Sequence, residues 1–265
     1  MKAVLSIAGS DSSGGAGIQA DIKTIEAYGL FAETAITALT AQNTTGVFGV
    51  VDIEPDFVAA QIDAVFEDIR PAAVKIGMVS SAAIIEAIAA RLEYHHARNI
   101  VVDPVMVSTS GSRLIGDDAR GALVERLLPL ADVVTPNMPE AAVLCGFPVE
   151  SEDDMERAAH YLAAPNKGVV LVKGGHREDA ADDVLVAPSG IAVWLRARRI
   201  ATLNTHGTGC TLSAGIACGL AEGCDISTSV RRAKYFVTGA LESGLDLGRG
   251  NGPLDHKWQR GAPSV

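Results

Sequence analysis

The sequence has little positive charge and no long apolar run. Its 22 lysines and arginines face 32 aspartates and glutamates, so the formal net charge is −10 at pH 7. Nucleic acids and anionic membranes bind clustered basic residues, and this balance argues against both as partners. No stretch approaches the roughly 18 uninterrupted apolar residues of a membrane helix. The short apolar run near Met1 is too short for a signal peptide and predicts a first strand.

Paired cysteines and two nucleotide-binding motifs are also missing. The 4 cysteines contain no C-x-x-C pair and no zinc-like grouping, which favours a cytoplasmic protein with reduced thiols. The phosphate-binding motif G-x-x-x-x-G-K-[ST] and the protein-kinase signature set do not occur. Any phosphoryl transfer must therefore use another scaffold.

What the chain does have is a regular alternation of Val/Ile-rich runs and Ala-rich helical patterns. This predicts an α/β fold of three layers, with a mostly parallel central sheet and helices on both faces. Strands are expected at 3–8, 34–40, 73–76, 100–102, 133–135 and 168–172, with an antiparallel edge hairpin of 183–187 and 191–195. Helices are expected at 16–28, 55–69, 81–95, 117–127, 138–145, 152–162, 209–221 and 227–243. No linker or repeat occurs, so residues 1–265 are expected to form one domain.

Polar, glycine-rich segments follow each of the expected parallel strands. Ligands of open α/β sheets bind outside the carboxyl ends of the strands, so we expect these segments to form one site. They are residues 9–17, 42–46, 75–80, 103–116, 136–140 and 173–176.

The stretch from Asn204 to Gly215 is the most informative of all. Gly207, Thr208, Gly209 and Cys210 stand where a polar loop enters a small-residue helix. Backbone N–H groups at a helix N-terminus suit a phosphate, and a thiol at its mouth can take part in chemistry. An ordinary glycine-rich turn before a core helix is the alternative.

Asp103 and Glu140 follow successive strands and could share a Mg²⁺ ion, which needs only one or two carboxylates beside phosphates. Glu140 also stands three residues after Asn137, so a helix-capping pair is an alternative. Lys173 ends a strand near the expected phosphate site, or snorkels to the surface.

The first loop and the second strand offer groups for a small substrate. The glycines of residues 9–17 allow a close approach of the backbone, and Asp21 could serve as a polar anchor one turn into the next helix. A solvated acid is the alternative for Asp21. Gln42 and Asn43 could hydrogen-bond a planar heteroaromatic ring, or be structural amides.

Together these segments resemble the ribokinase-like superfamily, and within it the hydroxymethylpyrimidine/phosphomethylpyrimidine kinases of thiamine biosynthesis. The similarity runs from residue 8 to residue 253. The matching pieces are 8–11, 17–24, 37–44, 75–78, 102–106, 135–140, 173–176, 204–213 and 248–253.

The resemblance implies a cytoplasmic, homodimeric phosphotransferase that uses ATP and Mg²⁺. It would phosphorylate 4-amino-5-hydroxymethyl-2-methylpyrimidine and then its monophosphate. The roles it implies cover thirteen residues: Gly9, Asp21, Gln42, Met78 and Val105 for the pyrimidine, Gly207, Thr208, Gly209 and Cys210 for the transferred group, Lys173, Thr208 and Asn137 for the nucleotide, and Glu140 and Asp103 for the metal.

Cys210 departs from the wider superfamily, whose sugar kinases carry an aspartate base at this place. A helix N-terminus can lower the pKa of a thiol, so Cys210 could still accept a proton. A neutral thiol would also tolerate the anionic second acceptor, which a carboxylate would repel.

Three other functions remain open. Pyridoxal kinases of similar sequence share nearly every motif but carry a second cysteine in the loop that corresponds to residues 107–113, where this chain has none. A cysteine hydrolase could pair Cys210 with His206. A non-catalytic binding protein on the same scaffold would lack key residues, and none is missing.

Overall fold

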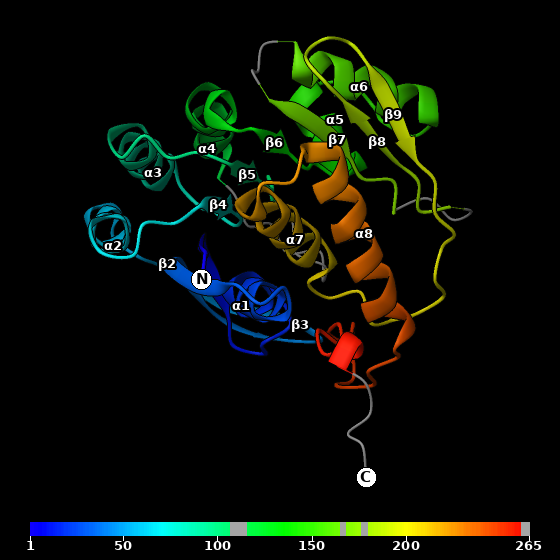
Figure 1. Ribbon diagram of the computed structural model, residues 1–265, viewed down its shortest axis with the longest axis horizontal. Helices are drawn as coiled ribbons and strands as arrows, with labels where there is room; N and C mark the ends of the chain where they lie inside the picture. Colours follow the sequence, from blue (N-terminus) through cyan, green and yellow to red (C-terminus); the bar gives the residue numbers. More distant parts are fainter. Residues whose placement is uncertain (107–115, 165–167, 176–179, 261–265) are drawn as a thin grey trace.

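Nine strands form one sheet at the centre of the computed structural model, which describes residues 1–106, 116–164, 168–175 and 180–260 (Figure 1). The strand order is β3-β2-β1-β4-β5-β6-β7-β8-β9. Neighbouring strands from β2 to β7 run parallel, whereas β3, β8 and β9 pair antiparallel at the two edges. The strands are β1 (Ala3–Asp11), β2 (Phe31–Asn43), β3 (Gly46–Asp52), β4 (Ala73–Ile76), β5 (Ile100–Val102), β6 (Val133–Val134), β7 (Val169–Val172), β8 (Asp183–Val186) and β9 (Ala192–Leu195). The expected α/β class and edge hairpin are confirmed.

Helices cover both faces of this sheet. One face carries α2 to α6, and the other carries α1, α7 and α8 (Figure 1). The helices are α1 (Gly17–Ala27), α2 (Pro55–Glu67), α3 (Ala82–Tyr94), α4 (Asp117–Ala122), α5 (Met138–Cys145), α6 (Glu152–Ala163), α7 (Thr208–Glu222) and α8 (Ile226–Glu242). None of the described helices is long and apolar enough to cross a membrane.

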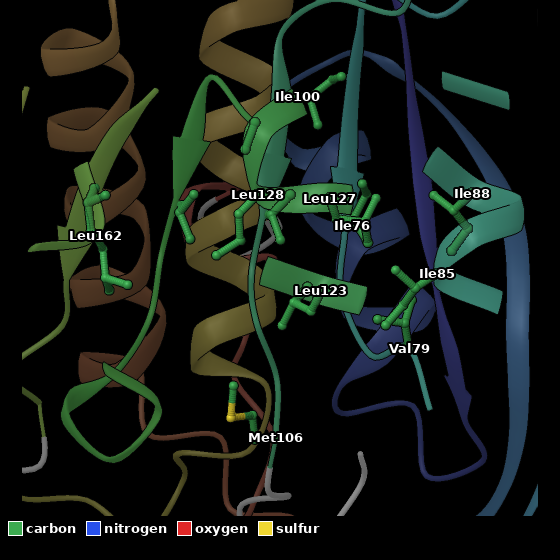
Figure 2. Packing of buried hydrophobic residues seen from close by; sticks show 14 of the residues in the cluster. Ile76, Val79, Ile85, Ile88, Ile100, Met106, Leu123, Leu127, Leu128 and Leu162 are labelled. Carbon is green, nitrogen blue, oxygen red and sulfur yellow. The ribbon is translucent and has the colours of Figure 1, made fainter. Parts of the chain in front are cut away.

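The hydrophobic core has two layers because successive strand residues point to opposite faces. Val101 packs under α7, whereas its neighbour Val102 packs under the opposite helices. Figure 2 shows this second layer, where Ile76 and Ile100 of the sheet meet Leu127 and Leu128. Apolar residues of the strands form part of both layers, and the polar residues described below lie near the strand ends.

Two expected strand ends were wrong, and one strand was missed. β1 continues to Asp11, so residues 9–11 belong to the strand and not to a loop. β2 continues to Asn43 because it pairs with β3, a strand that the sequence analysis did not identify. Most residues of β3 are exposed, and the strand contains two glycines. It therefore lacks the alternation of apolar and polar residues that is typical of a half-buried strand.

The helix expected at 117–127 is divided. Its first part is the α-helix α4. A π-helical turn, Leu123–Leu127, and a 3₁₀ turn, Leu128–Leu130, follow it. Pro129 lacks the N–H that would continue the helical ladder, which explains why regular helix stops here.

Candidate functional site

Polar side chains end four parallel strands on the face that α7 covers. A residue two positions after a core residue lies on the same face of the sheet. In β5, Val101 packs under α7 and Asp103 follows two residues later. The same spacing gives three further pairs: Ala73 and Lys75, Val133 and Thr135, and Leu171 and Lys173. The periodicity of the sheet therefore gathers these groups beneath α7.

Asp103 and Lys173 form a buried ion pair. Lys173 Nζ lies 2.7 Å from Asp103 Oδ1, which also accepts a hydrogen bond from Thr135 Oγ1 at 2.9 Å. Burial opposes the charge of Asp103, but Lys173 and Lys75 outweigh it and lower the pKa of the carboxyl. The Lys173 side chain is only 14% exposed, so the snorkelling interpretation is wrong.

Glu140 both caps a helix and belongs to this charged cluster. Asn137 Oδ1 accepts from the Glu140 N–H at 2.8 Å, and Glu140 Oε2 accepts from the Asn137 N–H at 2.8 Å. The capping pair is therefore confirmed. Burial raises the pKa of Glu140 to about 7, and repulsion by Asp103 adds to it while Lys173 opposes it.

The raised pKa of Glu140 predicts a pH-dependent stability. Between the ordinary pKa of 4.5 and the folded pKa of about 7, the folded chain holds a proton that the unfolded chain has released. The free energy of unfolding should therefore fall as pH rises through this window, by roughly 3 kcal/mol for this group. Glu140→Gln should remove that part of the slope, measured as urea midpoints against pH. An identical slope in both proteins would contradict the prediction.

The N-terminus of α7 has free backbone donors. Gly207 is the N-cap residue, with φ +86°, and its carbonyl accepts the first helical bond from the Thr211 N–H at 2.9 Å. The Thr208 N–H donates to a carbonyl of the preceding turn at 3.3 Å. Within the described part of the chain, this leaves the N–H groups of Gly209 and Cys210 for a ligand.

These donors lie directly against the ion pair. A Cβ atom built on Gly209 would be 3.3 Å from Asp103 Oδ2 and 3.4 Å from Lys173 Nζ. The start of α7 and the strand-end charges therefore lie together, an arrangement that an ordinary glycine-rich turn before a core helix does not require.

Cys210 lies in the first turn of α7, where its thiol is not activated. Burial raises the pKa of Cys210 to about 11; Lys75 opposes this, whereas the carboxylates of Asp21 and Asp103 add to it. The expectation that the helix N-terminus would lower the pKa was wrong, because burial outweighs the helix dipole. The thiol is neutral at pH 7.

Gly9 and Met78 meet at the point where the strand order reverses. β1 lies between β2 and β4, and open α/β sheets bind ligands at such a switch point. A Cβ atom on Gly9 would lie 3.1 Å from Met78 Sδ, beside a register shift in β1. Val105 is half-buried just past β5, and its N–H donates to the Asp103 carbonyl at 2.8 Å. Gly9 and Met78 therefore lie together at the switch point, and Val105 follows the strand β5.

Asp21 is fully buried, so its interpretation as a solvated acid is wrong. Its Oδ2 lies 2.7 Å from Lys75 Nζ and accepts from Ser6 Oγ at 2.6 Å. Asp21 Oδ1 is buried without a hydrogen-bond partner among the described residues. The sequence analysis missed the role of Lys75, although a lysine within the apolar run Ala73–Ile76 is a recognisable signal because buried lysines are almost always paired.

Gln42 ends β2 beside His206. Its Nε2 lies 3.4 Å from His206 Nε2, and its Oε1 accepts from Thr40 Oγ1 at 3.2 Å. His206 Nε2 itself is bonded to Asp11 Oδ2 at 2.8 Å. Among the described residues, no hydrogen bond joins the His206 ring to the Cys210 thiol, whose backbone partner is Gly17, so the Cys–His pair of a cysteine hydrolase is not formed.

Two features fall on residues that the structure does not describe. They are the loop 107–115, whose missing second cysteine distinguishes this chain from similar pyridoxal kinases, and His176 of the 173–176 segment.

The acids suit a transient cation. Among the described residues, no group of three or more His, Cys, Asp or Glu side chains could hold a metal by itself. Asp103 and Glu140 are buried, and the repulsion that raises the pKa of Glu140 is relieved by any cation between them. Mg²⁺ commonly binds to one or two carboxylates together with substrate phosphates, so these residues fit it.

Comparison with known proteins gives consistent matches. The model of the family described as phosphomethylpyrimidine kinase matches residues 11–255. The hydroxymethylpyrimidine/phosphomethylpyrimidine kinase of Rhizobium meliloti is 49% identical, over 95% of this chain and 96% of that protein. The phosphomethylpyrimidine kinase structure from Clostridium difficile is 44% identical with a TM-score of 0.81, over 91% of this chain and 100% of that one. The ADP complex of Bacillus subtilis pyridoxal kinase is 36% identical with a TM-score of 0.90, over 98% and 99% of the two chains.

Proposed function

The chain belongs to the phosphomethylpyrimidine kinase family, and from that premise we propose that its strand-end site phosphorylates the aminopyrimidine of thiamine biosynthesis. The first acceptor is the 5-hydroxymethyl group, and the second is the resulting monophosphate. The protein is a phosphotransferase, and ATP is its phosphoryl donor. The proposal rests on the position of Gly209, in the first turn of α7, beside the Asp103–Lys173 pair.

Phosphoryl transfer needs positioning and charge stabilisation more than covalent help. The N–H groups of Gly209 and Cys210 would hold the migrating group, and the positive end of α7 would stabilise its charge. Lys173 would neutralise phosphate oxygens of the nucleotide, with Thr208 and Asn137 beside it. These donors are fixed before the substrate arrives, which is what makes them effective.

We propose that Glu140 and Asp103 hold Mg²⁺ together with the phosphates of the nucleotide. When bound, the ion offsets phosphate charge. Asp103 is already ionised in the ion pair, whereas Glu140 must lose the proton that burial favours. Metal binding should therefore release a proton near pH 6 and flatten the stability slope that Glu140 causes.

The pyrimidine ring would lie beside Gly9, Met78 and Val105, at the switch point of the sheet. Asp21 Oδ1, buried and unpartnered, could accept a hydrogen bond from the ring amine. The Gln42 amide would bind an acceptor on the ring. Polar contacts on opposite sides would fix the orientation of a flat heterocycle, so its hydroxymethyl group faces Cys210.

The neutral thiol of Cys210 suits two acceptors of different charge. Cys210→Asp should lower phosphorylation of the monophosphate roughly tenfold more than that of the alcohol, because a carboxylate repels the anionic acceptor. Cys210→Ser, a neutral control, should lower both rates equally. The measurement is ADP release with each acceptor, and equal losses in Cys210→Asp would refute the charge argument.

A coupled assay of ADP release tests the function as a whole. Hydroxymethylpyrimidine, its monophosphate and pyridoxal serve as acceptors, and the proposal predicts turnover of the first two. Pyridoxal phosphorylation is the second candidate, because the fold matches a pyridoxal kinase with a TM-score of 0.90. Turnover of pyridoxal alone would replace the proposed function by this one.

The organisation of the whole protein is part of the proposal. The described residues of the site lie at strand ends of one sheet and on α1, α5 and α7, which pack against that sheet, and this supports a single kinase domain over residues 1–265. The homodimer and the cytoplasmic location that the resemblance implies stay predictions, and sedimentation of the purified chain checks the first.

A further inference from the structure

His206 stands immediately before Gly207, where the turn that presents the free N–H groups of α7 begins. It has no part in the reaction as proposed so far. It is 4% exposed. Its Nε2 lies 2.8 Å from Asp11 Oδ2, and its backbone N–H donates to the Gly252 carbonyl at 3.0 Å. The end of β1, the start of α7 and the C-terminal segment therefore meet at this one side chain.

Asp11 is the charged partner in this contact. Burial works against its ionisation, but hydrogen bonds from His206, Ser13 and Ala16 lower the pKa of Asp11 to about 2. The carboxylate accepts from the backbone N–H groups of Gly15 at 3.0 Å and of Ala16 at 2.8 Å. Because a carboxylate at neutral pH only accepts, His206 Nε2 must carry the proton of this bond.

Close packing joins the same two segments. A Cβ atom on Gly15 would lie 2.3 Å from His206 Cδ2, and one on Gly207 would lie 1.9 Å from the Gly15 carbonyl oxygen. Asp11 thus holds the loop before α1, and His206 holds that loop against the turn before α7. A shift of the His206 ring would therefore move Gly207, the first residue of the turn that presents the free N–H groups of α7.

The same proton sets the orientation of Gln42. Gln42 Nε2 is 3.4 Å from His206 Nε2, and two N–H donors cannot bond to each other. Gln42 Oε1 lies 3.2 Å from Thr40 Oγ1, whose hydroxyl also donates to the Ser10 carbonyl at 2.9 Å, and the Gln42 amide NH₂ remains available for an acceptor. The ring of the proposed pyrimidine offers such an acceptor in its nitrogens.

We propose that His206 is a positioning residue, which through Asp11 keeps the N–H groups of Gly209 and Cys210 and the Gln42 amide in the geometry that the transfer requires. The inference rests on the proposed function, since it assigns a role within that reaction. His206 binds neither substrate; it acts through the segments that do. Its effect should fall on turnover more than on nucleotide binding, because aligned donors matter most in the transition state.

The test compares two substitutions of similar size. His206→Leu removes the donor, whereas His206→Gln places an amide N–H near the position of Nε2. We expect His206→Leu to lower kcat about 100-fold with the KM for ATP within about threefold, and His206→Gln to keep kcat within about fivefold of the unchanged protein. His95→Leu is the control, because it breaks another His–Asp pair, with Asp63 at 2.6 Å, which is partly buried and remote from the site.

Hydrogen exchange of the unliganded protein gives a readout that needs no substrate. His206→Leu should speed exchange in the peptide that contains residues 207–210, whereas His206→Gln and His95→Leu should not. Unchanged kcat and unchanged hydrogen exchange in His206→Leu would overturn the inference. Equal losses of kcat in His206→Leu and His206→Gln would also overturn it. Failure of the unchanged protein to phosphorylate any acceptor would overturn the proposed function instead, and the exchange data would still decide whether His206 holds the turn.

Discussion

Lys173→Met is expected to lower kcat by roughly 1000-fold. The substitution removes the ammonium that lies 2.7 Å from Asp103 and that also faces Glu140. Two buried carboxylates then repel each other and the incoming phosphates. The KM for ATP should rise as well, since the nucleotide loses its neutralising partner. Steady-state kinetics by ADP release measures both effects.

A loss of folding must be separated from this loss of chemistry. Breaking a buried ion pair costs about 3 to 5 kcal/mol, so Lys173→Met should also lower the urea midpoint. The double substitution with Asp103→Asn removes the stranded charge and should recover much of the stability without recovering the rate. Recovery of the urea midpoint and of kcat together would mean that Lys173 contributes to folding alone.

Gly207→Ala is expected to lower kcat by roughly 1000-fold, because it displaces the turn that presents the donors. The backbone at Gly207 has φ +86°, and a methyl group would lie 1.9 Å from the Gly15 carbonyl oxygen. Strain and collision act together, so the turn must move. Kinetics with the pyrimidine alcohol measures the change.

Gly223→Ala provides the control for backbone strain. Gly223 ends the same helix with φ +94°, but a Cβ atom there meets nothing within 4 Å. It should cost about 1 to 2 kcal/mol of stability through its left-handed backbone and leave kcat unchanged. Equal activities of the two variants would show that the Gly207 turn does not take part in the transfer.

The parts of the site that follow from local rules could be predicted from the sequence. The period of two within strands places Asp103 and Lys173 on one face. The three-residue spacing of Asn137 and Glu140 gives the capping pair. The glycines before Cys210 predict the start of α7. Each of these depends only on neighbours along the chain.

The parts that depend on contacts across the chain could not be predicted. Asp21 and Lys75 are 54 residues apart, and Asp11 and His206 are 195 residues apart. No local pattern says which buried charge meets which. The direction of the Cys210 pKa shift was predicted wrongly for the same reason. Burial raises this pKa, and the charged groups around the thiol, Lys75, Asp21 and Asp103, come from distant parts of the chain, whereas the helix terminus alone suggested the opposite direction.

The most direct test is a crystal structure with ADP, aluminium fluoride and hydroxymethylpyrimidine, in which the fluoride complex imitates the phosphoryl group in flight. The account predicts that its fluorine atoms lie within hydrogen-bond distance of the Gly209 and Cys210 nitrogens, between the nucleotide and the pyrimidine hydroxyl. A fluoride complex bound elsewhere, with those two nitrogens contacting neither ligand, would contradict it.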